Sequence, residues 1–355
     1  MEELRVPKDR LSEFVKNVFL AAGLDEKDSG IISRHLVLAS LRGIDSHGVS
    51  RTGIYTKRIS LGLTNKTFEP EIERETPSSA LINGKTASGI LNATEAIRLA
   101  VEKAKVTGIA VVGVKNSNHC GMLADYTMYA AEQGCIALAT TAAPPNMAPW
   151  GGKERFFGTN PFAYGIPAGD GKDIIFDMAT SVVARGKIIL AEKNHQKIPL
   201  GWAISADGEP TTDPTEALDG LVLPVGGPKG YGIALMVDLL SSLFTGASFG
   251  PHITDLYKDF DHKQNVGHTF IVMRADLFRP QEEFEAEVQK LIREVKNIER
   301  MPGVEEIYLP GEIEANRAKE REENGIPLSK DVIEELESIG KEYGVTDLLS
   351  EEYIG

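Results

Sequence analysis

At 355 residues, the chain is longer than one simple core accommodates, and its length favours about two domains. A hydrophobic fraction of 42% and a charged fraction of 25% are ordinary for a globular protein and exclude a disordered chain. With a formal net charge of −14 and no visible basic cluster, the chain is expected to bind neither nucleic acid nor an anionic membrane surface.

The cysteine content and the first residues predict a cytoplasmic protein. Only two cysteines occur, Cys120 and Cys135, which are too few for a disulfide framework in a chain of this length. The N-terminal residues are charged and do not form the positive region and apolar core of a secretion signal. The longest apolar stretch, residues 233–244, contains polar side chains and is too short to span a bilayer.

The N-terminal part of the chain is predicted to be helical. Apolar side chains recur at helical spacing over residues 8–62, with Gly23 and Gly43 marking interruptions. The next segment, residues 64–79, is rich in proline and charge, which indicates a linker. We therefore expect a helical unit at residues 1–75, completed by C-terminal residues from about 280 to 355.

From residue 80 onward, strand patterns alternate with helix patterns, which is typical of a layered α/β domain. We expect this domain over residues 76–279. Strands are predicted at residues 80–82, 109–114, 136–141, 162–166, 174–176 and 270–273. Helices are predicted at residues 92–105, 123–133, 181–192, 233–244, 282–298 and 328–343. Residues 142–159 form a long loop rich in Pro and Gly, residues 210–220 are predicted turns, and Gly186 indicates a close approach by another backbone.

Polar side chains of several chemistries crowd the end of the helical unit. Asp45 and Ser46 are good N-cap residues, so a helix is expected to follow them. In that helix His47, Arg51 and Tyr55 are spaced four residues apart and share one face.

Such a face is suited to bind a small carboxylate. An arginine can hold a carboxylate through two parallel hydrogen bonds, and a tyrosine can add another. The His47 imidazole is expected to be neutral because the first turn of a helix carries positive potential. The alternative is an ordinary solvated helix face, and Lys57 and Arg58 are expected to be exposed on this helix.

Two further polar residues follow predicted strands. His119 lies in a polar loop after the strand at 109–114, where α/β sheets place ligands, but it could equally bond to local backbone. Asp177 ends the strand at 174–176. It could orient an imidazole, bind a ribose hydroxyl or cap the helix that begins near Ser181.

A glycine-rich loop at residues 226–232 contains Lys229 and opens a helix, so its N–H groups and the lysine could meet a phosphate. No G-x-G-x-x-G follows a strand, so a dinucleotide, if bound, is not bound in the Rossmann manner. The seven histidines show no metal-binding spacing, and no metal site is predicted.

Taken together, six segments resemble the type-2 malate/L-lactate dehydrogenase family, which includes sulfolactate and ureidoglycolate dehydrogenases and a cyclic imino-acid reductase. The resemblance covers nearly the whole chain. The segments are residues 43–51 (GIDSHGVSR), 116–121 (NSNHCG), 158–162 (GTNPF), 176–181 (FDMATS), 226–232 (GGPKGYG) and 310–312 (PGE).

The resemblance implies an oxidoreductase that transfers a hydride between NAD or NADP and a small 2-hydroxy or 2-oxo acid, with malate or lactate as the expected substrate. It also implies a non-Rossmann layered α/β domain with a mixed sheet, a helical domain built from both ends of the chain, and a homodimer. Imino-acid reduction and sulfolactate- or ureidoglycolate-type dehydrogenation are alternatives within the family. A non-catalytic small-molecule binding protein is the alternative of another class.

The same resemblance assigns roles to residues. His119 is the candidate acid/base, with His47 as its rival for proton transfer. The implied substrate-binding residues are Ser46, Arg51, Tyr55, Thr159 and Asn160. The implied cofactor-binding residues are Asp177, Met178, Ala179, Gly227, Pro228, Lys229, Pro310, Gly311 and Glu312. At Ala142 and Ala143 the sequence departs from family members that carry a polar cofactor contact in this loop, so that contact is not carried over.

Overall fold

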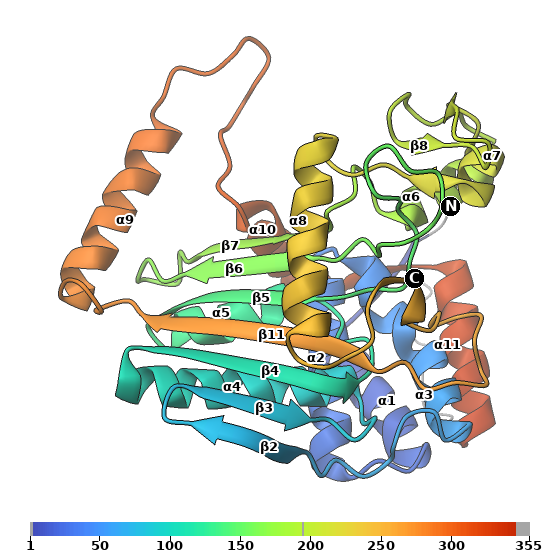
Figure 1. Ribbon diagram of the computed structural model, residues 1–355, viewed down its shortest axis with the longest axis horizontal. Helices are drawn as coiled ribbons and strands as arrows, with labels where there is room; N and C mark the ends of the chain where they lie inside the picture. Colours follow the sequence, from blue (N-terminus) through green and yellow to red (C-terminus); the bar gives the residue numbers. More distant parts are fainter. Residues whose placement is uncertain (1–2, 194, 346–355) are drawn as a thin grey trace.

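The computed structural model describes residues 3–193 and 195–345 and contains a helical part and an α/β part (Figure 1). In the helical part, four helices pack around one apolar core. They are α1 (Lys8–Ala21), α2 (Glu26–Leu41), α3 (Thr52–Ser60) and α11 (Lys330–Tyr343). Strands β1 (Glu3–Val6) and β12 (Ile326–Ser329) pair antiparallel and bring early and late segments side by side. The division of the chain at residues 75 and 280 stays a prediction.

The helices form where the apolar spacing predicts them. Residues Leu11, Phe14 and Val18 of α1 are buried, at the spacing of one helix face. Helix α2 begins after Asp25, whose carboxylate accepts the Asp28 N–H at 2.7 Å and so satisfies a free amide of the first turn.

The α/β part is built on a seven-stranded sheet in the order β2-β3-β4-β11-β5-β6-β7. The strands are β2 (Glu71–Thr76), β3 (Ser79–Asn83), β4 (Ile109–Ser117), β5 (Cys135–Thr141), β6 (Phe162–Ile166), β7 (Ile174–Met178) and β11 (Val266–Arg274). Strands β3 and β4 are parallel, whereas the other neighbouring strands are antiparallel. This mixed sheet confirms the layered, non-Rossmann α/β class, because a Rossmann sheet is mostly parallel.

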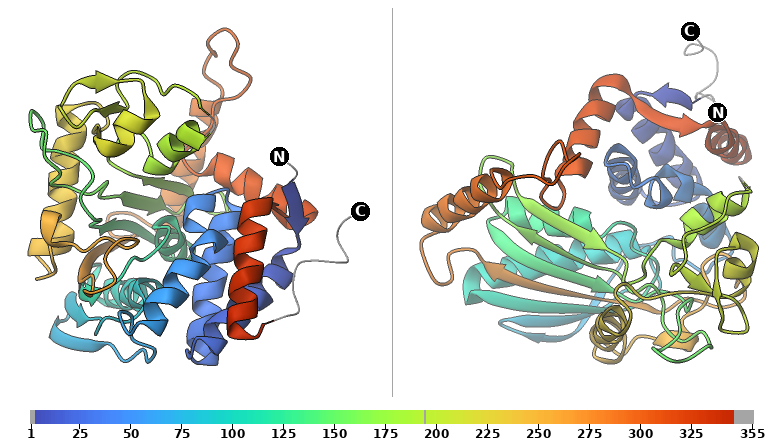
Figure 2. Two further views of the ribbon diagram at one scale, coloured as in Figure 1. Left: turned by 90° about the vertical axis from the view of Figure 1, so that its right-hand side faces the viewer. Right: turned by 90° about the horizontal axis from the view of Figure 1, so that it is seen from above.

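Helices cover the two faces of the sheet unequally. Helices α4 (Gly89–Thr107) and α5 (Ala124–Glu132) pack on one face through a core that contains many alanines, which lets helix and sheet approach closely. Helix α8 (Pro228–Asp238) crosses the opposite face, as Figures 1 and 2 show. Helix α9 (Gln281–Lys296) lies at the far end of the sheet, and the loop after it projects from the body (Figure 1).

Two predictions about polar segments are wrong. The second half of the predicted linker at 64–79 forms β2, the edge strand of the sheet, and all six of its residues are exposed. Edge strands are commonly charged, so their sequences look like linkers. The predicted turn at 210–220 contains the short strand β9 (Pro210–Thr211) and helix α7 (Pro214–Asp219).

Strand β9 belongs to a small three-stranded sheet in the order β10-β8-β9, formed with β8 (Ala203–Ile204) and β10 (Leu221–Val222). Helix α6 (Arg185–Lys193) lies beside it and begins four residues later than predicted. The close approach predicted at Gly186 is also wrong, because no described atom lies within 4 Å of a Cβ built there.

The C-terminal half differs from the prediction mainly at helix ends. Helix α8 begins at Pro228, inside the predicted loop, and continues as a π-helical turn over Leu239–Leu243. Helix α10 (Glu312–Asn324) is strongly polar and was not predicted. Within residues 3–193 and 195–345, no helix combines the length and the apolar character that a bilayer crossing requires.

Candidate active site

The segment before α3 does not form the predicted continuous helix. It folds as two 3-10 turns, Asp45–His47 and Val49–Arg51, joined by Gly48 in an extended conformation. A Cβ added to Gly48 would lie 2.1 Å from Ser40 Oγ, and that oxygen accepts the Val49 N–H at 3.1 Å. The close packing against α2 therefore replaces the first helical turn.

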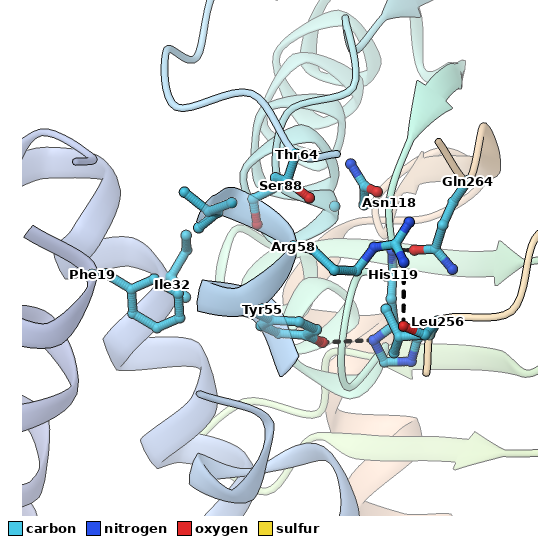
Figure 3. Close-up of a pocket in the computed structure, with 12 residues that line it drawn as sticks. Phe19, Ile32, Tyr55, Arg58, Thr64, Ser88, Asn118, His119, Leu256 and Gln264 are labelled. Carbon is cyan, nitrogen blue, oxygen red and sulfur yellow. Dashed lines mark hydrogen bonds between the residues drawn. The ribbon is translucent and has the colours of Figure 1, made fainter. Parts of the chain in front are cut away.

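The predicted site residues of this segment nevertheless converge on His119. The Tyr55 hydroxyl lies 2.6 Å from His119 Nδ1, a contact visible in Figure 3. The rings of His47 and His119 stack, with centroids 5.4 Å apart and an angle of 24° between planes. Ser46 Oγ lies 3.0 Å from His47 Nδ1. The structure thus brings together four of the residues predicted from separate parts of the sequence.

The hydrogen bonds around His119 define one tautomer. The Gly121 N–H points at Nδ1 from 3.3 Å, and an N–H group can only donate. Nδ1 is therefore an acceptor, Tyr55 donates to it, and the ring proton of the neutral imidazole lies on Nε2. No hydrogen bond joins Nε2 to a described residue. Nε2 is thus the atom of His119 available to a ligand. The His119 backbone N–H is held by Gln264 Oε1 at 3.3 Å.

Burial keeps the two imidazoles and the phenol of the site uncharged. Burial, with Arg51 and His35 as smaller causes, lowers the pKa of His47 to about 3. Burial also lowers the pKa of His119 well below its ordinary value, and His47 and Arg51 act in the same direction. The pKa of Tyr55 is raised by burial, so the phenol stays protonated. His47 is therefore neutral as predicted, but because of burial and a nearby cation rather than a helix N-terminus.

Arg51 is the cation whose charge helps to lower the pKa of both imidazoles. Its Nε donates to Ser46 O at 2.5 Å, and its guanidinium carbon lies 5.1 Å from the centre of the Tyr257 ring. No hydrogen bond joins its two Nη groups to any described residue. The hydrogen bond at Nε thus orients the guanidinium, and its Nη groups remain available to hold a carboxylate.

Tyr55 and His119 line a pocket between the helical part and the sheet (Figure 3). One wall carries Arg58, which the sequence predicts to be exposed. That prediction is wrong: Arg58 is only 1% exposed and donates to the carbonyl oxygens of Leu256, Asp259 and His262 at 3.3, 2.8 and 3.1 Å. An arginine beside a lysine in a helix looks solvent-exposed, and its carbonyl partners lie some two hundred positions away in the sequence.

Sequence reasoning also missed a buried histidine that supports the His119 loop. His35 of α2 lies 2.7 Å from Asp125 Oδ2 through Nδ1, and its Nε2 accepts the Met122 N–H at 3.0 Å. A Cβ on Gly121 would lie 2.1 Å from the same Nε2. This carboxylate–imidazole–amide chain fixes the loop just after His119. No local pattern in the sequence relates His35 to a carboxylate ninety positions away.

The predicted cofactor segments meet around β7. On one side of this strand, Ile175 N donates to Pro310 O at 3.1 Å; just beyond its end, Val225 N donates to Thr180 O at 2.9 Å. Asp177 Oδ2 accepts the Ala124 N–H at 2.8 Å. Asp177 therefore caps α5, the helix after the His119 loop, and not the helix near Ser181. The strand thus links residues 177–179, the loop before α8 and residues 310–312 to the histidine loop.

Two glycines in these segments adopt conformations that other residues avoid. Gly311 has φ +89°, and an added Cβ would lie 2.6 Å from Ile175 O. Gly227 has φ +63° and lies against the Trp150 ring, 3.0 Å from an added Cβ. They immediately precede the first residues of α10 and α8, whose free N–H groups can hold a phosphate. Lys229 is exposed in the first turn of α8.

Some predicted residues have other partners. The Glu312 carboxylate accepts the Leu309 N–H at 2.9 Å and pairs with Lys296 at 2.8 Å, so it closes the loop between α9 and α10. The buried Asn160 side chain accepts the Ala143 N–H and donates to Ala234 O, each at 3.0 Å. These contacts tie the loop at Ala143 to α8, and the substrate contact predicted for Asn160 stays a prediction.

The remaining predicted residues lie close to these contacts. Thr159 O accepts from the Thr180 N–H and hydroxyl, both at 2.8 Å. Met178, Ala179 and Pro228 lie in the segments already described, and Ala142 is buried. In the described part of the chain, no three His, Cys, Asp or Glu side chains are placed to hold a metal ion.

Comparisons with known sequences agree with this arrangement. A family model described as malate/L-lactate dehydrogenase matches residues 6–337. A malate dehydrogenase of Pyrococcus abyssi is 40% identical, over 97% of this chain and 96% of that protein. A ureidoglycolate dehydrogenase (NAD(+)) of Escherichia coli K12 is 34% identical over 94% and 95%. A (2R)-3-sulfolactate dehydrogenase (NADP(+)) of Chromohalobacter salexigens is 30% identical over 89% and 92%.

Solved structures show the same fold. The sulfolactate dehydrogenase of Methanocaldococcus jannaschii superposes with a TM-score of 0.91 and 36% identity, covering 97% of this chain and 98% of that one. A malate dehydrogenase of Entamoeba histolytica superposes with a TM-score of 0.92 and 33% identity, covering 97% and 99%.

Proposed function

The chain belongs to the malate/L-lactate dehydrogenase family, and on that premise we propose that it oxidises malate to oxaloacetate and catalyses the reverse reduction. As a member of this family it is an oxidoreductase that uses NAD or NADP and acts on small 2-hydroxy or 2-oxo acids. The observation that carries the proposal is the placement of His119, whose Nδ1 is bound by Tyr55 and whose Nε2 is left for a ligand.

His119 is the proposed acid/base. Base action in the oxidation direction uses the other neutral tautomer, in which Nδ1–H donates to the Tyr55 hydroxyl and the Nε2 lone pair takes the hydroxyl proton of the substrate. In the reduction direction the resulting imidazolium returns that proton from Nε2 to the carbonyl oxygen. Tyr55 supports both directions, because its hydroxyl can donate to Nδ1 or accept from it. A bound anion would oppose the Arg51 charge that helps to lower the pKa of His119. Substrate binding would therefore bring the histidine closer to the range in which it exchanges protons.

Arg51 is the proposed anchor of the substrate carboxylate. Its Nε is held by Ser46 O, which leaves the Nη groups to bind the carboxylate in their plane. His47 is better suited to hydrogen-bond the substrate than to store a proton, because burial keeps its pKa near 3. Anchoring the acid beside His119 would place the reacting C2–O group next to Nε2.

The cofactor segments fit a dinucleotide. Gly227 and Gly311 turn the backbone with a positive φ just before α8 and α10, and an added Cβ would meet Trp150 or Ile175 there. The proposed contacts are the backbone of residues 177–179, 227–229 and 310–312, with Lys229 pairing a phosphate. These residues would hold a dinucleotide whose nicotinamide would serve as acceptor or donor of the C2 hydride. The absence of a polar side chain at 142 and 143 leaves that side of the site to backbone contacts.

We also propose that the chain forms a homodimer through the face of the sheet that α8 crosses. Exposed apolar side chains form a stripe along α8 and its π-helical extension. They are Met236, Leu239, Leu243 and Phe244, and Phe244 is 70% exposed. The neighbouring strands present half-buried apolar side chains such as Leu138 and Ile271 on the sheet. A stripe and an open face of this kind are typical of a protein interface.

The cytoplasmic location stays a prediction; Cys120 and Cys135 are unpaired and buried.

The proposed reaction is tested by mixing the purified protein with NADH or NADPH and a panel of 2-oxo acids while absorbance is followed at about 340 nm, where reduced nicotinamides absorb. Oxaloacetate should give the fastest decay. Faster decay with pyruvate, a sulfonated 2-oxo acid or a cyclic imino acid would overturn the malate assignment and identify another substrate of the family. No decay with any acid and either cofactor would contradict the dehydrogenase reaction itself.

A further inference from the structure

Three basic side chains of residues 51–58 contact one loop, residues 254–264. One of them is Arg51, the proposed substrate anchor. Arg51 lies over the Tyr257 ring at 5.1 Å, and Lys57 lies over the Phe260 ring at 3.9 Å. Arg58 donates to three carbonyl oxygens of the same loop. Cation–ring contacts and charged hydrogen bonds of this kind fix a loop against a helix.

Hydrogen bonds within the loop also join its two ends. Thr254 Oγ1 donates to Lys263 O at 3.0 Å, and the buried Gln264 side chain donates to Thr254 O at 3.1 Å. Asp255 Oδ1 accepts the Tyr257 N–H at 2.7 Å, which sets the turn that carries the ring. A compact loop whose ends meet is a rigid unit that often carries function. Tyr257 is therefore presented in one position.

That position is significant because of what the Tyr257 ring covers. The Arg51 guanidinium carbon lies over the face of this ring, 5.1 Å from its centre, so the ring flanks the group that is proposed to hold the carboxylate. Tyr257 is 50% exposed, and its hydroxyl makes no hydrogen bond to any residue of the described chain. Tyr257 thus contacts the proposed anchor and is at the same time accessible from outside.

We propose that Tyr257 determines substrate specificity by forming the wall of the substrate pocket next to the carboxylate anchor. The inference rests on the proposed function, since Arg51 must hold the carboxylate for the wall to matter. An acid held edge-on by Arg51 projects its C3 substituent beside the ring. A small substituent fits there, and a branched one collides with the wall.

The test measures a ratio: kcat/KM for the branched 3-methyl-2-oxobutanoate divided by kcat/KM for pyruvate. Tyr257→Ala should raise this ratio by about tenfold or more, the range that a few methylene groups contribute in an apolar pocket. Tyr257→Trp should lower it, because the larger ring narrows the pocket. Tyr257→Phe keeps the wall and should leave the ratio within about threefold of the wild type.

Phe260→Ala is the matched control. It removes an aromatic ring from the same loop and the same kind of contact, but over Lys57, which faces solvent and has no proposed role. The ratio should stay at the wild-type value in this variant. The alanine and tryptophan variants predict opposite shifts, so a folding defect in one still leaves the other to decide.

The outcomes separate the two proposals. A wild type that reduces 2-oxo acids, combined with an unchanged ratio in both Tyr257→Ala and Tyr257→Trp, would overturn the role of Tyr257 alone. An equal change of ratio in Phe260→Ala would also overturn it, since the effect would then belong to the loop as a whole. A wild type that reduces no acid would remove the proposed function and this inference with it.

Discussion

The imidazole rings of His47 and His119 lie stacked, 5.4 Å apart, and both side chains are half-buried. Two protonated rings at this distance would repel each other strongly in a medium of low polarity, so the pair can carry one proton in excess at most. The partners of the two rings differ. Tyr55 and Gly121 bind Nδ1 of His119, whereas His47 faces Ser46 and the Arg51 charge. This asymmetry favours His119 as the ring that exchanges the proton.

Replacing either histidine should therefore have different effects on the pH profile. Base catalysis needs neutral His119, and its lowered pKa means that kcat/KM for oxidation should fall only as pH drops below about 6.5. His119→Ala should lower kcat by about 10²–10⁴-fold and abolish this fall. His47→Ala should retain the fall. The reverse pattern in pH–rate profiles would assign proton transfer to His47, and equal NADH affinity in both variants serves as the control.

Arg51→Lys should weaken substrate use although the positive charge is kept. A lysine cannot reproduce the planar fork, and its ammonium would lose the Ser46 carbonyl and the face of Tyr257. We expect KM for the acid to rise by about tenfold or more, the cost of about one charged hydrogen bond. NADH affinity should remain unchanged in calorimetry. An unchanged kcat/KM would exclude Arg51 as the anchor.

Lys229→Ala should weaken dinucleotide binding and leave the preference among 2-oxo acids as it is. The lysine lies exposed in the first turn of α8, where a phosphate can be bound by the helix N-terminus. Calorimetric titration with NADH and NADPH measures the effect. Lys290→Ala on α9 is the matched control, and affinity should be retained there. Equal affinities in both variants would remove Lys229 from the cofactor site.

His268 should make folding stability depend on pH. It is buried in β11 between Thr141 Oγ1 at 2.8 Å and Ser117 Oγ at 2.9 Å, and burial lowers its pKa to about 3. Between about pH 6.5 and 3, the unfolded chain therefore binds a proton here that the folded chain does not, and stability falls as pH falls.

From pH 7 to pH 5, this histidine alone should cost about 2 kcal/mol of unfolding free energy. Over the same pH interval, the unfolding free energy of His268→Asn should fall by about 2 kcal/mol less than that of the wild type. Urea titrations at each pH measure this difference, which does not depend on the stability of the variant at pH 7. His252→Asn, at an exposed site, is the control and should follow the wild type. A pH dependence that stays the same in His268→Asn would show that His268 is not held neutral.

The sequence predicted the parts of the fold that have a strong local pattern. The helices with apolar spacing and the strands β4 to β7 and β11 lie where predicted, within a few residues. The edge strand β2 was missed because strand pairing at an edge leaves all its side chains in solvent. Helix α10 was missed because it buries no side chain, and so its sequence lacks the apolar period that reveals other helices.

The site was predictable to the same extent. His47, Tyr55 and His119 were singled out by residue type and position, and the fold brings them together. Arg58 and His35 were not, because their roles depend on carbonyl and carboxylate partners contributed by distant segments. Tyr257 carries no motif at all. Its position is set by the loop 254–264, whose closure only the folded chain shows.

The most direct test of the proposed reaction is to follow the transferred hydrogen itself. NADH deuterated at both C4 positions is incubated with oxaloacetate and the protein, and the product is analysed by mass spectrometry. We predict malate with one deuterium at C2, formed by the wild type and reduced by about 10²–10⁴-fold in rate in His119→Ala. Malate without deuterium, or no malate at all, would contradict hydride transfer to C2 and with it the function assigned to this site.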